Sequence, residues 1–508
     1  MKSKRGLYNI FFGVLSQVIT IGVGLIIPRL FIVNLGSEAN GLMSSVSQIF
    51  IYVGLLEAGI GTVSIQALYK PISQKDDKGI NKILSATAQY YKRAGLYYLL
   101  CVGILGIVYP LIIKSSFNKL DIFLIILFTG LSGAINFLFQ GKYKIFLMAE
   151  GKNYIISNIN TIVGVFSSLV KVMLLLLGYN VVIIQFSYFI INLCQMAFFE
   201  IYIRRNYKWI NTKMDPDYEA IAQRNSAFIH QIVGMIFANT DVLVITMFCG
   251  LKVASVYSMY NLIITYIGNI LGNVNSGIIF ILGQTYYEDR NRYLKLNDIY
   301  DTYYMALNFA IYTVTYILFL PFMQLYTAGV KDINYIDNLL PILFVFIQVL
   351  NCGRTAANNA INVAGHFKKT QNRSIIEAII NIVVSLVCVN IFGIYGVLIG
   401  TIVALVYRVN DIILYSCKYI LFRSPIKTYF RWIINLVTMV LIINIINKLN
   451  LYIDNYVELI LAGVILSLTI IPTYLIIASV FNKENYKYVK EFIVIRLKSK
   501  FLLNRDMQ

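Results

Sequence analysis

The sequence predicts an all-α, polytopic membrane protein with about fourteen transmembrane helices. Three observations lead to this prediction. Apolar stretches recur from Leu7 to Val480, most Lys and Arg fall in alternate gaps between them, and glycine landmarks recur at one fixed offset. A hydrocarbon core about 30 Å thick needs ~20 apolar residues of helix. Stretches such as 155–177, 181–203 and 457–480 meet that length.

Hydropathy places the spans in chain order, each bounded by a polar or charged gap. The first apolar run resembles a signal peptide, but it is too long and lacks a small-residue cleavage site, so we expect it to remain as the first span. The first seven spans are expected at about 7–33, 42–65, 95–113, 122–139, 155–177, 181–203 and 227–248. The last seven are expected at about 255–284, 299–319, 339–363, 375–392, 394–414, 432–446 and 457–480.

The basic residues predict the orientation of the chain. Of the 43 Lys and Arg, 34 fall in the termini and in one alternate set of loops, five fall in the complementary loops, and four lie inside spans. Short loops rich in Lys and Arg stay in the cytoplasm. We therefore expect both termini in the cytoplasm.

An internal repeat predicts two six-helix lobes. Gly36 and Gly250, Gly54 and Gly268, and Gly151 and Gly365 each lie 214 residues apart. An even number of spans per copy gives both copies the same orientation, which is the parallel repeat of several transporter folds. The expected parts are an N-terminal lobe (1–203), a cytoplasmic linker (204–226), a C-terminal lobe (227–414), two extra spans (415–480) and a basic tail (481–508).

Composition excludes several classes of protein. The net charge of +19 follows from cytoplasmic loops that meet anionic lipid headgroups, so nucleic-acid binding is not expected. The six cysteines form no CxxC pair, and we expect no metal site, cofactor or disulfide framework. The longest external loop, about 321–338, is too short for a folded domain, which argues against catalysis outside the membrane.

Several segments resemble a known family. The first two spans contain IIPRLFIVNLGSEANGL and GLLEAGIGTVSIQALY, the seventh reads FIHQIVGMIFANTDVLVITMFCG, and the turns MAEGKNY and NVAGHFKK follow spans 4 and 10. These segments resemble the Wzx-type polysaccharide flippases of the multidrug/oligosaccharidyl-lipid/polysaccharide exporter superfamily, over residues 1 to about 414.

The resemblance implies two lobes of helices, alternating access, and export of an undecaprenyl-pyrophosphate-linked oligosaccharide for a surface polysaccharide such as O-antigen or capsule. The implied partners are the lipid-linked oligosaccharide, membrane lipids, a proton or sodium ion, a polysaccharide polymerase and a chain-length regulator.

Basic residues inside spans are the candidates for binding such a substrate, because a charge at mid-bilayer costs ~2.5–3.5 kcal/mol on insertion scales. Arg29 follows Pro28 in span 1, where it either faces a water-filled cavity or snorkels to the interface. Arg354 shares a face of span 10 with Asn358, and together they either line the cavity or pack against polar neighbours. Lys171 either contacts the ligand or snorkels.

Acidic residues inside spans are candidates for coupling. Glu57 and Asp241 either pair with cavity arginines, carry a coupling proton or cation, or stay protonated. Arg408 and Asp411, three residues apart on one helix, are expected to pair with each other. Glu377 and His230 are expected at the membrane interface.

Three classes of function remain open. The first is the lipid-linked oligosaccharide flippase, which is not an enzyme. The second is a cation-coupled multidrug antiporter of the same superfamily, which the four bases and four acids within spans do not exclude. The third is a membrane glycosyltransferase or polymerase, for which Glu38 is the one suggestive external acid. The lack of an external domain argues against this third class.

Overall fold

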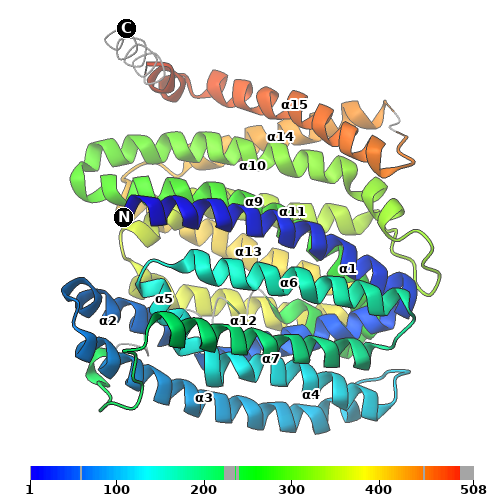
Figure 1. Cartoon of the computed structure of the whole chain (residues 1–508). Coiled ribbons are helices and arrows are strands. Elements are labelled where there is room, and N and C mark those ends of the chain that lie inside the picture. The colour runs from blue at the N-terminus through cyan, green and yellow to red at the C-terminus, as the bar shows by residue number, and fades with distance from the viewer. Residues whose placement is uncertain (1, 58–59, 222–234, 236–238, 450–451, 492–508) are drawn as a thin grey trace, which may run out of the picture. The chain divides into compact units, whose positions relative to one another are not determined.

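A computed structural model describes the chain except for residues 1, 58–59, 222–234, 236–238, 450–451 and 492–508 (Figure 1). The described elements are helices, and this part of the chain contains no strand. Eleven described helices are long and apolar enough to cross a membrane, and Asn239–Cys249 is a shorter apolar helix. The all-α membrane fold predicted from hydropathy is confirmed.

Every expected span overlaps a described helix. The first seven labelled helices are α1 (Lys2–Val53), α2 (Ile60–Gln74), α3 (Asp77–Ile112), α4 (Lys119–Ile135), α5 (Gly141–Ala149), α6 (Asn153–Leu176) and α7 (Val181–Asn206). The others are α9 (Leu251–Glu288), α10 (Arg290–Tyr326), α11 (Leu339–Val363), α12 (Phe367–Phe392), α13 (Ile394–Ser416), α14 (Ile426–Asn447) and α15 (Tyr456–Phe481). Short turns of helix lie at Gly54–Glu57, Asn136–Gln140, Glu219–Ile221 and Cys417–Leu421.

Glycines related by the predicted offset share a backbone conformation. Gly36 breaks α1 into two helical segments, with φ 85°, and Gly250 separates Asn239–Cys249 from α9, with φ 88°. Gly151 and Gly365, in the turns before α6 and α12, have φ of 75° and 69°. Residues other than glycine are strained in this left-handed region, because their Cβ atom clashes with the backbone. The break at Gly36 therefore divides the first two expected spans, and two of the three glycine pairs have equivalent local structure.

Helix starts follow from polar side chains at the N-cap position. Asp76 accepts a hydrogen bond from the backbone N–H of Gly79 before α3, and Asn180 accepts one from Ile183 before α7. Asp289 caps α10 in the same way. Such caps satisfy backbone donors that have no partner within the helix. They allow α3 and α10 to begin in polar sequence, well before the apolar stretches that hydropathy detects.

The helices group into two compact units. Unit 1 contains residues 1–262, 329–334 and 385–397, and unit 2 contains residues 263–328, 335–384 and 398–508. In unit 1, α1 packs against α6, and α4 packs between α3 and α7. In unit 2, α10 packs against α11, α14 and α15. The division into lobes near residues 204–226 stays a prediction.

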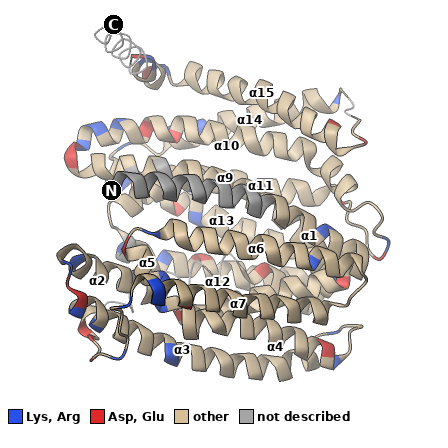
Figure 2. Ribbon diagram, viewed as in Figure 1, with Lys and Arg blue, Asp and Glu red and all other residues tan. Residues whose placement is uncertain are grey.

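Charged residues lie mainly near the ends of helices. In unit 1, Lys, Arg, Asp and Glu gather around α2, α5 and the nearby end of α3, whereas the central turns of α3, α4 and α7 carry few charges (Figure 2). Many apolar side chains of these helices point outward, including Leu100, Ile107 and Phe198. Outward-facing apolar side chains on long helices suit contact with hydrocarbon. The chain is therefore a multi-pass membrane protein.

Candidate functional site

Five charged side chains form a cluster within unit 2. Arg354 on α11 pairs with Glu377 on α12, with 2.7 Å between Nη1 and Oε1. Arg408 on α13 reaches the other oxygen of Glu377 from Nε at 3.2 Å, and its Nη1 lies 2.7 Å from Oδ2 of Asp411. Arg373 also pairs with Asp411. We call these five residues the arginine cluster.

The arginine cluster carries three positive charges and two negative ones, so one positive charge is in excess. The side chain of Arg354 is 21% exposed, whereas that of Arg408 is 6% exposed. The pairing predicted for Arg408 and Asp411 is confirmed. Glu377, expected at the membrane interface, is buried between two arginines. Because Arg408 is enclosed by its partners, Arg354 is the more accessible of these two cations.

Amides on α11 extend the polar surface beside Arg354. Asn358, which the sequence placed on the face of Arg354, is half-buried. Its neighbour Asn359 is buried, and its amide donates to Oδ1 of Asn275 at 2.8 Å and to the hydroxyl of Tyr300 at 2.9 Å. These contacts join α11 to α9 and α10. Asn359 therefore makes the contacts between helices, whereas the sequence had selected Asn358.

An apolar groove of about 410 Å³ lies between α9, α10 and α15 in unit 2. Tyr300 and Tyr304 stack at one side of it, with their ring centroids 5.0 Å apart. We call it the apolar groove, and its aliphatic lining includes Ile278, Ile281, Leu282, Ile299, Leu307 and Leu475. Hydropathy could not reveal this groove, because each of its helices is apolar over much of its length.

A polar chamber of about 540 Å³ lies within unit 1 and contains Lys144 and Lys171. The ammonium of Lys171 lies 4.3 Å from the ring centroid of Tyr188, and that of Lys144 donates to Oδ1 of Asn136 at 2.7 Å. No carboxylate is among the residues that line this chamber. Lys171 therefore faces polar groups within the bundle. Lys144 was assigned to a loop because its surrounding sequence is basic, although α5 continues through it.

The two coupling candidates contact tyrosines. The hydroxyl of Tyr91 on α3 donates to Oε1 of Glu57, and no cation among the described residues forms an ion pair with Glu57. Asp241 is buried in the helix Asn239–Cys249, where its Oδ2 accepts a hydrogen bond of 2.9 Å from the hydroxyl of Tyr257. Arg29, the remaining candidate, is half-buried on α1. His230 lies outside the described residues.

A close backbone contact joins α1 to the start of α9 within unit 1. A Cβ atom at Gly41 would lie 1.8 Å from the carbonyl oxygen of Leu251, so only glycine fits this position. Beside it, the amide of Asn40 donates to Oγ of Ser255 at 2.8 Å. Oγ of Ser37 donates to Oδ1 of Asp332 at 2.7 Å. We call this contact the α1–α9 closure.

A second charged cluster, which the sequence did not predict, holds α10 to α14 in unit 2. Asp298 and Asp301 pair with Arg423 and Arg431. Both contacts of Arg431 measure 2.8 Å. The charges balance, and Asn485 donates to Oδ2 of Asp298 at 2.8 Å. Both arginines had been counted as cytoplasmic loop residues. The pair of acids three residues apart at the start of α10 was the available signal.

The turn between α11 and α12 contains a histidine whose environment favours its neutral form. Burial lowers the pKa of His366, and the neighbouring cations Lys369 and Arg290 lower this pKa further. Its Nδ1 lies 3.2 Å from the hydroxyl of Tyr415. Because the pKa is lowered from an ordinary value near 6.5, the ring is neutral at pH 7.

Solved structures with a similar fold are membrane transporters. A structure of the lipid II flippase MurJ, in an inward closed conformation, has a TM-score of 0.70 at 15% identity and covers 94% of this chain and 99% of its own. An inward-facing multidrug resistance MATE family transporter of the MOP superfamily has a TM-score of 0.58 at 15% identity. This match covers 78% of this chain and 95% of the transporter. A mutant of the Vibrio cholerae MATE transporter VcmN has a TM-score of 0.56 at 12% identity. This match covers 82% of this chain and 97% of the VcmN chain.

These likenesses establish the fold of the chain, which is shared with a flippase and with drug transporters. The chain matches no protein-family model, and no curated protein matches its sequence.

Proposed function

We propose that this chain is a flippase that moves an undecaprenyl-pyrophosphate-linked oligosaccharide across the bacterial cytoplasmic membrane by alternating access, for synthesis of a surface polysaccharide. The observation that carries this proposal is the presence, within unit 2, of an apolar groove and of an arginine cluster with one excess positive charge. A prenyl pyrophosphate has a long apolar chain and an anionic head, and it needs both kinds of surface.

The cost of crossing the membrane explains the need for charge. A pyrophosphate and a glycan in hydrocarbon lose their water, and each unsatisfied polar group costs several kcal/mol. Arginine binds phosphate oxygens through two parallel N–H donors, and such charge-assisted bonds are stronger than neutral ones. In this proposal Arg354 binds the pyrophosphate, and Glu377 and Arg408 hold its guanidinium in place.

The C-terminal helices also support a lipid substrate. The flippase structure covers 94% of this chain and the inward-facing MATE structure covers 78%. The difference is about 80 residues. Within unit 2, α15 contributes Leu475 to the apolar groove. A helix that completes an apolar groove has a clear use in a lipid transporter and a less evident one in a drug antiporter.

A second candidate function is a cation-coupled multidrug antiporter, and the buried acid Asp241 favours it. A carboxylate buried in a span can exchange a proton or sodium ion for a cationic drug, because burial makes its charged form costly. If the chain confers resistance to cationic dyes in a host that lacks its own efflux pumps, this second candidate is favoured.

The groove provides the test of the lead proposal. Ile281 lines the apolar groove and is 56% exposed, whereas Ile270 lies on the same helix, is 52% exposed and does not line it. The wild type in proteoliposomes should move a long-chain lipid-linked disaccharide faster than a short-chain one. Ile281→Asn should lose this preference and Ile270→Asn should keep it. Equal rates for both chain lengths in the wild type would contradict the proposal.

A further inference from the structure

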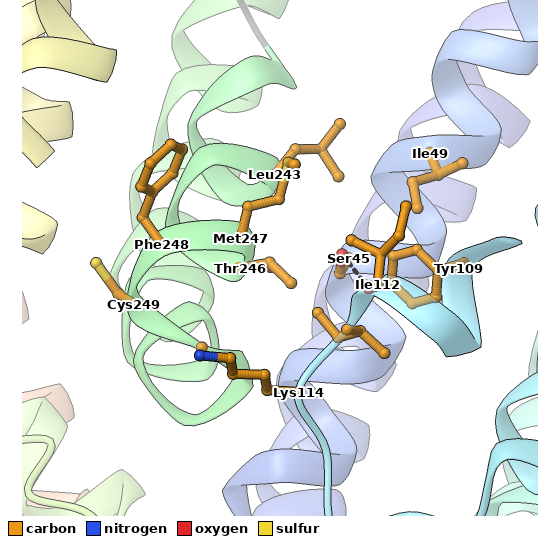
Figure 3. Close-up of a pocket in the computed structure, with 12 residues that line it drawn as sticks. Ser45, Ile49, Tyr109, Ile112, Lys114, Leu243, Thr246, Met247, Phe248 and Cys249 are labelled. Atoms are coloured by element: carbon orange, nitrogen blue, oxygen red, sulfur yellow. Dashed lines mark hydrogen bonds between the residues drawn. The ribbon is translucent and has the colours of Figure 1, made fainter. Parts of the chain in front are cut away.

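A second apolar pocket lies in unit 1, far along the chain from the groove. It has a volume of about 420 Å³ and is formed by three segments (Figure 3). The second half of α1 contributes Ser45 and Ile49, the end of α3 and the residues after it contribute Tyr109 and Lys114, and the helix Asn239–Cys249 contributes the opposite wall. This size is within the range of small-molecule sites, about 300–1,000 Å³.

Apolar side chains at the edge of the pocket are exposed. Ile112 and Met247 line it from opposite walls, and they are 61% and 68% exposed. Both belong to apolar helix ends, and exposed apolar side chains at such positions contact hydrocarbon in a multi-pass membrane protein. An apolar chain can therefore enter the pocket sideways from the bilayer.

Two polar groups in the pocket have no partner among the described residues. Lys114 forms no ion pair or hydrogen bond there, and Figure 3 shows its side chain extending across the pocket toward Cys249. Thr246 is 2% exposed, and its hydroxyl has no hydrogen-bond partner. By contrast, the hydroxyl of Tyr109 donates to Oγ of Ser45 at 2.7 Å. Buried hydroxyls are almost always paired, so the hydroxyl of Thr246 on this wall is available to donate to a ligand in the pocket.

We propose that this pocket is an exit site, which receives the prenyl phosphate end of the exported lipid. The proposal rests on the proposed function. The apolar walls hold the start of the prenyl chain, Lys114 binds a phosphate oxygen, and the hydroxyl of Thr246 donates to a second oxygen. Lys114 is one of the five basic residues in the loops predicted to be external. The site therefore lies at the end where a flipped lipid would leave.

The pocket has room for part of one apolar chain. At ~30 Å³ for each water-sized group, its volume of about 420 Å³ holds roughly fourteen such groups. The pocket also includes Gly250, and the next residue, Leu251, forms the α1–α9 closure with Gly41. A lipid in this site is thus adjacent to the contact that must part if the helices separate at this end.

The test uses the full-length protein in detergent and a photoactivatable undecaprenyl phosphate, with phosphatidylglycerol as a competitor. The probe should label peptides that contain residues 109–114 and 243–250. Lys114→Gln should lower this labelling roughly tenfold, and Thr246→Val should lower it by a smaller factor. Lys119→Gln is the matched control, because Lys119 is the first residue of α4, five residues after Lys114, is exposed and does not line the pocket. It should leave labelling unchanged.

The outcomes separate this proposal from the function on which it rests. The exit site alone would be overturned if the probe labelled the apolar groove but not the pocket. Equal labelling of Lys114→Gln and Lys119→Gln would have the same consequence. Competition by phosphatidylglycerol at equal concentration would also overturn it, because the site would then bind ordinary phospholipid. No labelling anywhere on the wild type would contradict the flippase function as well.

Discussion

Arg354 is the residue on which substrate binding in this account depends. Replacing it with Gln removes the excess positive charge of the arginine cluster and one charge-assisted contact to phosphate, which contributes about 1.5–3 kcal/mol. We expect Arg354→Gln to weaken export of a lipid-linked oligosaccharide by about 10- to 100-fold. The measurement is initial transport rate in proteoliposomes at matched protein density.

Arg373 provides the control for charge alone. It belongs to the same cluster, pairs with Asp411 and is more exposed than Arg354. Arg373→Gln removes the same charge from a guanidinium that pairs with Asp411 and not with Glu377, so the pair that holds Arg354 stays intact and we expect less than a threefold loss of transport. Equal losses in the two variants would show that total charge matters and that Arg354 has no specific contact.

Asp241 and Glu57 are the residues expected to couple transport to an ion gradient. Asp241→Asn can still accept the hydrogen bond from Tyr257 but cannot bind or release a proton. We expect the double variant Glu57→Gln, Asp241→Asn to insert normally and to lose most of its dependence on the proton or sodium gradient. Tyr257→Phe, which keeps the carboxylate, should retain that dependence. A double variant with full rate and full gradient dependence would remove both residues from coupling.

At the scale of single residues, the sequence predicted roles that depend on local context and missed those that depend on tertiary contacts. The pairing of Arg408 with Asp411 could be predicted because three residues separate them on one helix. Arg431 and Asp301 are 130 residues apart, so no local pattern connects them. The place of Lys144 in the polar chamber was missed for a related reason. A basic loop and a helix end that carries lysines have the same composition, so the sequence does not distinguish them.

The α1–α9 closure allows a prediction for two packed helix segments. Gly41→Ala places a methyl group where the carbonyl oxygen of Leu251 lies, so the two segments must separate. In a cysteine-free background, Asn40→Cys and Ser255→Cys should cross-link readily, because the native side chains are 2.8 Å apart. Adding Gly41→Ala should reduce the cross-linked fraction severalfold, measured by gel mobility.

Gly22→Ala is the control, since a Cβ at Gly22 on the same helix would meet no atom within 4 Å. It should leave cross-linking unchanged. If Gly41→Ala cross-links as fully as Gly22→Ala does, the closure tolerates a side chain and does not depend on glycine.

The packing of α10 against α14 depends on buried charges. Asp301 is buried and pairs with both Arg423 and Arg431. Asp301→Asn leaves those arginines short of one negative charge, and breaking a buried pair costs about 3–5 kcal/mol. We expect a lower midpoint of thermal unfolding in detergent. Asp289→Asn on the same helix should not change the midpoint, because Asn caps a helix as well as Asp does. Equal midpoints for both variants would contradict a stabilising role for the cluster.

At the scale of the whole molecule, hydropathy and the 214-residue offset predicted the class of fold and the positions of the helices. Hydropathy detects where a segment becomes apolar and not where its helix begins, so the expected span starts at residue 95, eighteen residues after α3 begins at Asp77. Two of the three glycine pairs at the predicted offset could be interpreted because left-handed turns require glycine. Cavities could not be predicted, because they depend on which apolar faces remain uncovered.

The most direct test of the account is the movement of a lipid-linked oligosaccharide by the purified protein. Vesicles with and without the protein would contain an undecaprenyl-pyrophosphate-linked disaccharide on their inner leaflet, and a lectin would report the sugar that reaches the outer leaflet. We expect gain of lectin binding with the wild type, about 10- to 100-fold slower gain with Arg354→Gln, and no accumulation of a cationic dye in parallel vesicles. Dye transport driven by an ion gradient, together with no movement of the lipid-linked sugar, would contradict it.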